Sequence, residues 1–460
     1  MNSELTQVLG ELTIGSDALN RLQYEKLKKL LLHVYDNSPY YREKFELAGV
    51  NPYEFRSLDQ FSDYPTFDKY EERESQARSI SVLGHPLGMH LTCDVREVNR
   101  MSASSGTTGT PIFQGHTAND RKIIFKNFHR VMEVIGSEPG DRVMMAGVMS
   151  MWVAGIPTVD ALLEYGANVI PIGGLVGTEK VIEMMILTRP EVLICTPSFA
   201  RQLVKKSQTQ FNVDLTQIGT RKICVYGEPG GSVPEIVREL SDGFGGAQVY
   251  DTGGGTGCLN PIFVSCEAYD GLHFITPDSA FIELYDRDTN SVIPWEDGAE
   301  GEFVYTGLDR ECGPLIRFMD GDKVRVNLKP CSCGLPGMRM RFLGRVDDML
   351  LVKGVNVFPS AIRDLVMSLD REVTGNVRVL RHSDSPVVEP PLQIKVECRG
   401  NPSVEDKADI KRRLTEIIQR QLRFKPAVIL FQEGELTMEY GTTGKVKILE
   451  TISKESGESA

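Results

Sequence analysis

The sequence lacks three features that would place it in large classes of protein. No apolar run reaches the roughly 18 residues that a membrane-spanning helix needs. The first residues, MNSELTQVLGEL, show no basic stretch followed by the apolar core of a secretory signal. Excess positive charge is missing too: the formal net charge of −12 argues against a nucleic-acid-binding protein, which needs a cationic surface to displace phosphate counterions. We therefore expect a cytoplasmic protein with no membrane and no nucleic acid among its partners.

The nine cysteines occur without a secretion signal, so we expect thiols or metal ligands rather than a disulfide framework. Hydrophobic residues make up 41% of the chain and charged residues 25%, as in globular proteins. With 460 residues, the chain is longer than one ordinary core and predicts two or three domains.

Short apolar segments alternate with helical patterns in the first half of the chain. Helical spacing of apolar residues appears in residues 21–37 and 119–136. Apolar segments that end in Gly, Pro or Thr follow at residues 141–149, 168–174, 191–197, 222–229 and 248–254. This alternation predicts an α/β fold with parallel strands joined by crossover helices, whose ligands gather beyond the carboxyl ends of the strands.

The pattern changes twice in the second half. Residues 280–286 and 301–308 resemble shorter, more polar strands and favour an antiparallel or barrel-like subdomain. Beyond the stretch GRVDDMLLVKG, two helical and several strand patterns indicate a small α+β domain. We predict a large N-terminal domain over residues 1–345, with mixed or parallel sheets and a barrel-like subdomain, and a small mobile C-terminal domain over residues 346–460.

Residues 102–111 read SASSGTTGTP, a stretch of hydroxyl groups and glycines with little apolar surface. Consecutive backbone amides in such a turn, supplemented by hydroxyls, form a cradle for phosphate oxygens. The stretch is not a Walker loop, because the Gly-Lys-Ser/Thr ending is missing. The alternative is a solvated surface loop.

Several ordered motifs resemble the phenylacetate-coenzyme A ligase family of the adenylate-forming ligases. They are SSGTTGTP (104–111), PEVLICTPSFARQLV (190–204), VYGEPGGSVPEI (225–236), GEFVYTGLDRECGPLIRFMDGD (301–322) and GRVDDMLLVKGVNVFPSAI (344–362). The resemblance covers nearly the whole chain. It implies ATP-dependent activation of a small-molecule carboxylic acid, expected to be aromatic, to an acyl-adenylate. Transfer to coenzyme A would then give a thioester, AMP and pyrophosphate.

The resemblance also implies roles for individual residues. Lys445 would be the catalytic lysine between the substrate carboxylate and the α-phosphate, and Asp347 the hinge. The phosphates would contact Ser104, Ser105, Gly106, Thr107, Thr108 and Gly109. The rest of the nucleotide and acyl site would comprise Glu228, Pro229, Tyr250 beneath the adenine, Asp251, Thr252, Asp322 at the ribose and Arg345, with Gly354 beside the pantetheine arm of coenzyme A. The alternatives are a strand-ending turn at 228 and 229, a core tyrosine at 250, turn residues at 322, 345, 347 and 354, and a solvated lysine at 445.

Four residues indicate a structural zinc site. Cys266 and His273 lie across an expected hairpin from Cys331 and Cys333, whose Cys-x-Cys-Gly spacing can present two sulfurs to one metal. Together they would form a closed Cys3His site. Buried free thiols are the alternative.

The chain departs from the family pattern at two positions. Gly254 stands where the family has a glutamate that helps to hold Mg²⁺, and Thr110 stands where it has a lysine. Asp251 or Glu267 could serve the metal instead. We expect the glycine run around Gly254 to open space beside the acyl pocket, so that the acid need not be phenylacetate.

Two other functions stay open at this point. The adenylate could pass to an amine or a carrier-protein thiol, or the chain could be a non-catalytic nucleotide-binding scaffold, for which Gly254 and Thr110 speak. The resemblance is also compatible with a homodimer.

Overall fold

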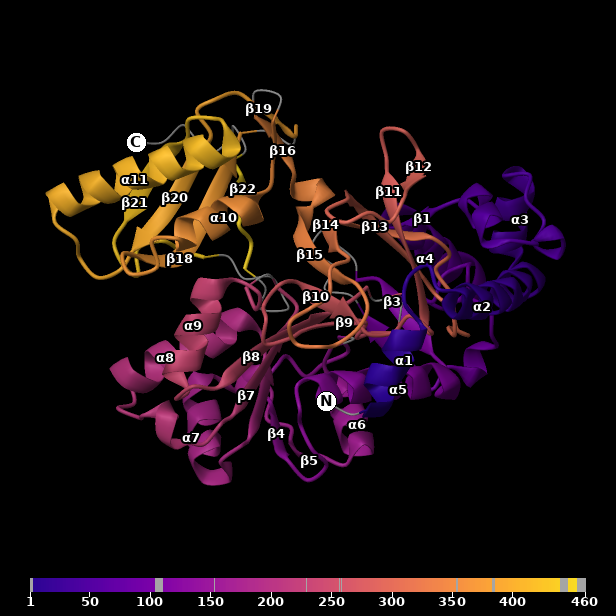
Figure 1. Ribbon diagram of the computed structural model, residues 1–460, viewed down its shortest axis with the longest axis horizontal. Helices are drawn as coiled ribbons and strands as arrows, with labels where there is room; N and C mark the ends of the chain where they lie inside the picture. Colours follow the sequence, from indigo (N-terminus) through magenta and orange to yellow (C-terminus); the bar gives the residue numbers. More distant parts are fainter. Residues whose placement is uncertain are drawn as a thin grey trace. The chain divides into compact units, whose positions relative to one another are not determined.

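The computed structural model describes residues 3–103, 111–152, 154–228, 230–255, 257, 259–352, 355–382, 385–438 and 446–452 (Figure 1). The chain forms two compact units. The first comprises Met1–Asp320 and Val324–Arg341, and the second comprises Gly321–Lys323 and Phe342–Ala460. Among the described residues, no helix has the length and apolar character needed to cross a membrane.

The first unit opens with four helices: α1 (Ser3–Glu11), α2 (Asp17–Asn37), α3 (Pro39–Leu47) and α4 (Lys69–Leu83). Helix α2 confirms the helical pattern of residues 21–37. It begins where the Ser16 side chain accepts a hydrogen bond from the backbone amide of Leu19, and it buries Leu27, Leu31 and Val34 on one face.

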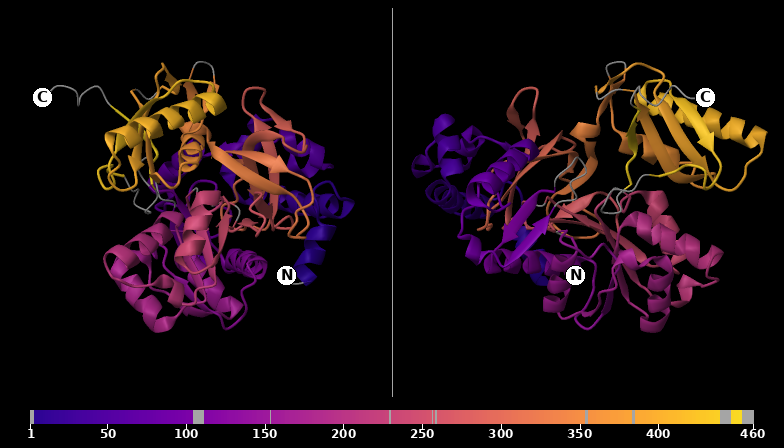
Figure 2. Two further views of the ribbon diagram at one scale, coloured as in Figure 1. Left: turned by 60° about the vertical axis from the view of Figure 1, so that its left-hand side comes forward. Right: turned by 180° about the vertical axis from the view of Figure 1, so that it is seen from behind.

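The predicted parallel strands are confirmed. They are β4 (Arg142–Met145), β5 (Asn168–Ile170), β6 (Val192–Cys195), β7 (Lys222–Tyr226) and β8 (Gln248–Gly253), which pair in the order β8-β7-β6-β4-β5. Figures 1 and 2 show helices on both faces of these strands. The helices are α5 (Ala118–Val134) and α6 (Ile156–Tyr165) on one face, and α7 (Thr178–Thr188), α8 (Pro197–Thr209) and α9 (Pro234–Gly243) on the other. Strands covered on both faces are apolar throughout, as β6 is.

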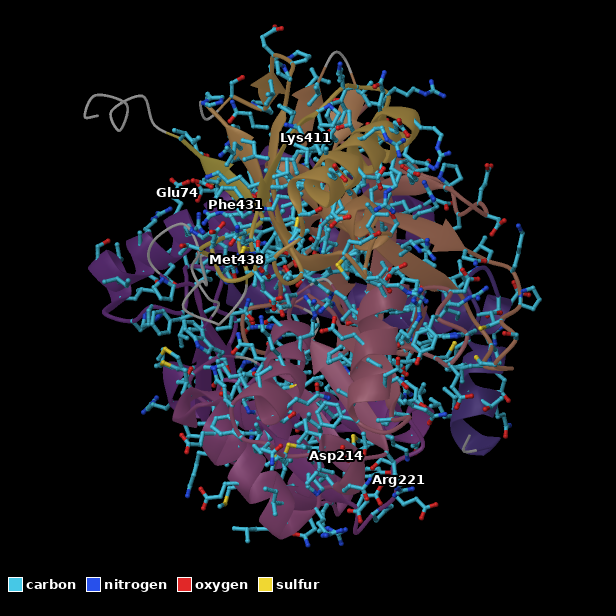
Figure 3. The ribbon with its side chains drawn as sticks, turned by 90° about the vertical axis from the view of Figure 1, so that its left-hand side faces the viewer. Glu74, Asp214, Arg221, Lys411, Phe431 and Met438 are labelled. Atoms are coloured by element: carbon cyan, nitrogen blue, oxygen red, sulfur yellow. The ribbon has the colours of Figure 1, made fainter. Side chains whose placement is uncertain are left out.

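Arg221 marks the amino ends of these strands, opposite the edge where ligands are expected. It directly precedes β7, and its guanidinium lies 3.0 Å from the carboxylate of Asp141, which directly precedes β4. In Figure 3, Arg221 and Asp214 lie at the lower edge of this α/β region.

The later strands pair antiparallel with one another, as predicted, and they extend the same sheet instead of forming a barrel-like subdomain with a sheet of its own. They are β9 (Phe263–Ser265), β10 (Leu272–Phe274), β11 (Ala280–Asp286), β12 (Ser291–Ile293), β13 (Glu300–Gly307), β14 (Phe318–Asn327) and β15 (Arg339–Arg345). Because β9 pairs antiparallel with β8, the hydrogen-bond ladder continues without a break. The result is a mixed 13-stranded sheet in the order β12-β11-β13-β14-β15-β10-β9-β8-β7-β6-β4-β5, with β1 (Phe67–Asp68) beside β14.

The second unit has its own core. A four-stranded sheet contains β18 (Val373–Arg381), β20 (Gln393–Cys398), β21 (Ala427–Phe431) and β22 (Leu449–Thr451), and a three-stranded sheet contains β16 (Leu350–Val352), β17 (Val355–Val357) and β19 (Val387–Val388). Helices α10 (Pro359–Met367) and α11 (Val404–Leu422) contact each other and the larger sheet (Figure 2). The domain boundary between residues 345 and 346 stays a prediction. The hinge at Asp347 stays one as well, because a hinge is a property of motion.

Candidate active site

Glu228 lies at the carboxyl end of β7 and joins that end to the neighbouring helix α8. Its Oε1 atom accepts a hydrogen bond of 2.7 Å from the backbone amide of Ser198, in the first turn of α8. The amides at a helix N-terminus lack partners within the helix and favour a carboxylate. Glu228 therefore fixes the turn after β6 at the edge of the sheet where the acyl and adenine pocket was expected.

Three predicted residues lie on β8 and face different surroundings. Tyr250 is 2% exposed, packs in the hydrophobic core and donates a hydrogen bond to the side chain of Gln248. Its burial favours the core alternative, and its contact with adenine stays a prediction. Asp251 is half-buried and accepts a hydrogen bond of 2.9 Å from the hydroxyl of Ser232, while the hydroxyl of Thr252 donates to the carbonyl of Phe263.

The expectation that the glycine run opens space agrees with Gly253, where an added Cβ atom would meet nothing within 4 Å, but is wrong for three other glycines of the run. Gly254 has a φ of +155°, and a Cβ atom there would lie 2.5 Å from Asn260 Oδ1 and 2.7 Å from Ile262 Cγ1. A Cβ atom at Gly255 would overlap the ring of Tyr305, and one at Gly257 would lie 2.8 Å from Leu315. The family's glutamate therefore has no room at position 254, because neighbouring side chains fill the space.

In the second unit, the structure brings together Asp322 on β14 and Arg345 at the end of β15. Their side chains form an ion pair of 3.5 Å. The backbone before Arg345 is held closely: the Ser360 hydroxyl donates to the carbonyl of Leu343, and a Cβ atom at Gly344 would lie 2.8 Å from Phe358. The carboxylate of Asp322 offers two oxygens, which are suited to accept hydrogen bonds from two ribose hydroxyls.

Several predicted residues lie outside the described residues: Ser104, Ser105, Gly106, Thr107, Thr108, Gly109, Thr110, Pro229, Gly354 and Lys445. The side chain of Asp347 is outside them as well. Both ends of the hydroxyl and glycine stretch are described, because β2 (Arg100–Ala103) and β3 (Phe113–His116) form an antiparallel pair in which Ala103 lies opposite Phe113.

Cys266, His273, Cys331 and Cys333 meet in one cluster of the first unit. Their ligand atoms all lie within 4.8 Å of one another, with Cys266 Sγ 3.5 Å from Cys331 Sγ and Cys333 Sγ 3.5 Å from His273 Nε2. Zinc–sulfur bonds of about 2.3 Å in a tetrahedron place sulfurs about 3.8 Å apart. Burial, reinforced by Arg339, lowers the pKa of His273 to about 4, so the imidazole is neutral at pH 7 and able to bind a metal. These donors fit a Cys3His zinc site.

The sequence interpretation missed two residues on α4, Glu72 and Gln76, which contact the segment that follows residues 104–110. A signal was present: Glu72, Ser75, Gln76 and Ser79 repeat at helical spacing as a polar stripe. Without the structure, such a stripe is indistinguishable from an ordinary solvated helix face.

The sequence is similar to curated ligases over most of its length. It is 30% identical over 387 residues to a phenylacetate-coenzyme A ligase of Thermus thermophilus, covering 84% of this chain and 83% of the relative. It is 29% identical over 453 residues to a phenylacetate-coenzyme A ligase of Escherichia coli, covering 96% of this chain and 97% of the relative. No protein-family model matches the sequence.

Solved structures match the fold. A 2-hydroxyisobutyryl-CoA ligase in the postadenylation state, in complex with 2-HIB-AMP, superposes with a TM-score of 0.84 at 24% identity, covering 96% of this chain and 91% of that one. An anthranilate CoA ligase in complex with anthranoyl-AMP gives a TM-score of 0.56 at 18% identity, covering 76% and 65%. The mixed α/β architecture, with its large mixed sheet and small C-terminal sheet, is that of CoA ligases.

Proposed function

This chain belongs to the phenylacetate-coenzyme A ligase family, and we propose from that membership that it is an AMP-forming acid–CoA ligase. The observation that carries the proposal is the similarity to ligases along nearly the full length of both chains, 96% and 97% for the Escherichia coli relative. The substrates are a carboxylic acid, ATP and coenzyme A.

The reaction has two half-reactions, adenylation and thioester formation, because the carboxylate must be activated before a thiol can attack it. A carboxylate is a poor electrophile, because its leaving group would be an oxide ion. One carboxylate oxygen attacks the α-phosphorus of ATP, a P–O bond forms, and pyrophosphate leaves. The sulfur of coenzyme A then attacks the acyl carbon, loses its proton, and releases AMP, which leaves a thioester.

We assign the nucleotide contacts as follows. Residues 104–109 hold the phosphates, and Asp322, which forms an ion pair of 3.5 Å with Arg345, accepts hydrogen bonds from the ribose hydroxyls. Glu228 shapes the pocket at the end of β7 through its bond to α8. Lys445 stabilises charge at the α-phosphate during adenylation. The second unit turns about Asp347 between the half-reactions and brings Gly354 to the coenzyme A arm.

Asp251 is the carboxylate we assign to Mg²⁺, in place of the glutamate that position 254 cannot accommodate. Glu267 is less suited, because it accepts a hydrogen bond from Gln248, the first residue of β8. It therefore lies near the amino end of that strand, whereas Asp251 lies closer to the carboxyl end, beside Ser232. A bound Mg²⁺ would neutralise charge on the phosphate oxygens.

Carboxylate-dependent exchange of labelled pyrophosphate into ATP tests the proposed function. We expect exchange with at least one acid from a panel of aryl, heteroaryl and aliphatic acids, and a thioester when coenzyme A is added. If the acyl group passes only to amines or to a carrier protein, the acceptor is that amine or carrier thiol and not coenzyme A. No exchange with any acid in the panel would favour a non-catalytic scaffold.

We propose that the Cys3His cluster holds a structural zinc ion. The zinc would tie the β14–β15 connection, which carries Cys331 and Cys333, to the β9–β10 hairpin, which carries Cys266 and His273. Elemental analysis of the purified protein is expected to find about one zinc per chain. Cys331→Ser/Cys333→Ser is expected to lose the metal and to lower Tm by about 5 °C or more.

Cys398→Ser is the matched control, because Cys398 is a buried cysteine in the second unit, outside the cluster. This variant is expected to keep its zinc. Metal-free protein with an unchanged Tm, or a double variant with full zinc content, would contradict the assignment.

A further inference from the structure

Helix α4 buries a polar face. Helices of folded proteins usually bury an apolar stripe, and buried polar groups need hydrogen-bond partners. The buried residues of α4 are at most 4% exposed and lie at positions i, i+3, i+4 and i+7: Glu72, Ser75, Gln76 and Ser79. Glu74, labelled in Figure 3, belongs to the exposed side of the same helix. The hydrogen-bond partners of these four buried side chains therefore identify the segments that α4 holds in place.

Gln76 binds the backbone on which the hydroxyl and glycine stretch ends. Its Nε2 atom donates to the carbonyl of Pro111 at 2.9 Å, and its Oε1 atom accepts from the amide of Phe113 at 2.7 Å. The carboxamide of Gln76 thus pairs with a backbone carbonyl and a backbone amide two residues apart, which is the pattern that a neighbouring β-strand would bind. The chain is fixed at the point where it leaves residues 104–110.

A second side chain of α4, that of Glu72, contacts Gln114, the residue after Phe113. Gln114 donates from Nε2 to Glu72 Oε1 at 3.1 Å, and Gln114 pairs with Ser102 on the opposite strand. Burial raises the pKa of Glu72 to about 7, opposed by its hydrogen bond with Gln114 and by Arg310.

The other strand of the hairpin is anchored separately. The amide of Ala103 donates to the carbonyl of Met151 at 2.8 Å. Both stems of the hairpin are therefore fixed, the incoming one by backbone and the outgoing one by the side chains of α4.

We propose that Gln76 is a positioning residue for ATP, which acts through Pro111 and Phe113, the residues that follow the phosphate-binding segment. This inference rests on the proposed function, in which residues 104–109 hold the phosphates. A displacement of about 1 Å in a positioning element can cost a hundredfold in rate. A buried carboxamide with two backbone partners opposes such a displacement, because the Gln76 side chain would lose both hydrogen bonds while it stays buried.

Gln76→Met tests the proposal, because it keeps an unbranched side chain of similar length and removes both hydrogen bonds. In pyrophosphate exchange we expect the KM for ATP to rise about tenfold to a hundredfold. The KM for the acid, and the rate of thioester formation from a supplied acyl-adenylate, are expected to stay within about twofold. If Gln76→Met does not fold, Gln76→Leu replaces it. That variant also removes both hydrogen bonds, so a similar rise in the KM for ATP is expected.

Ser79→Ala is the matched control on the same helix face. The Ser79 hydroxyl bonds to the backbone of Gln76, His85 and Gly88, and none of these bonds reaches residues 111–113. This variant is expected to lower Tm and to leave the KM for ATP unchanged. An unchanged KM in a folded Gln76 variant, or an equal rise in Ser79→Ala, overturns the proposal. Absence of exchange in the unmodified protein counts against the proposed function instead.

Discussion

Lys445→Ala is expected to slow acyl-adenylate formation by about 10²- to 10³-fold, the usual effect of removing one group that stabilises transition-state charge. The resemblance to the family implies a place for this ammonium between the attacking carboxylate and the α-phosphate, where negative charge accumulates, and we assign Lys445 that role. Thioester formation from a supplied acyl-adenylate is expected to stay within about threefold, because that step no longer involves the triphosphate. Single-turnover measurements of each half-reaction give the two rates separately.

Lys447→Ala is the control for this experiment. Lys447 is an exposed lysine two positions further along the same segment, just before β22. It carries the same charge, so its replacement is expected to leave both half-reactions unchanged. Equal losses in both half-reactions for Lys445→Ala, or equal losses in the two variants, would contradict the role assigned to Lys445.

Glu283→Ala is expected to destabilise the first unit by about 3 to 5 kcal/mol, because it leaves a buried cation without its carboxylate. The Glu283 and Arg317 side chains are only 6% and 3% exposed and lie 3.0 Å apart. Arg317 also donates to the carbonyls of Ser62 and Tyr64 at 2.7 and 2.6 Å, so its guanidinium cannot turn toward water without breaking those bonds. Burial raises the pKa of Glu283 while Arg317 lowers it, which is the balance expected of a desolvated pair.

The comparison is with Glu300→Ala, which removes the partner of Arg325 on the surface. In that pair the side chains are 51% exposed for Arg325 and 35% for Glu300, so the expected loss is at most about 1 kcal/mol. Urea unfolding, followed by a probe in the first unit, measures both variants. Similar stabilities of the two variants would contradict the importance of the buried pair. The buried Glu283–Arg317 pair also helps to fix the start of β14, the strand that carries Asp322, because Arg317 directly precedes that strand.

Local sequence was sufficient for features that depend on neighbouring residues. The apolar runs at residues 192–195 and 223–226 identified β6 and β7, because strands covered on both faces are mostly apolar. The helical spacing of Leu27, Leu31 and Val34 identified α2 for a similar reason. The ordered motifs also indicated the ligase family, which the curated relatives confirm.

What required the tertiary structure were contacts between distant segments. Pairing of β9 with β8 merged the late strands into the large sheet, and the rings and side chains of Tyr305, Asn260 and Ile262 filled space that the glycine run had been expected to leave open. Gln76 meets Pro111 and Phe113 only because α4 packs beside the β2–β3 hairpin. Sequence by itself determined the parallel strands, helices α2 and α5, and the family, because periodicity and motif order are local properties of the chain. Only the fold decided which side chains share a site, because packing brings together residues whose separation along the chain carries no information about distance.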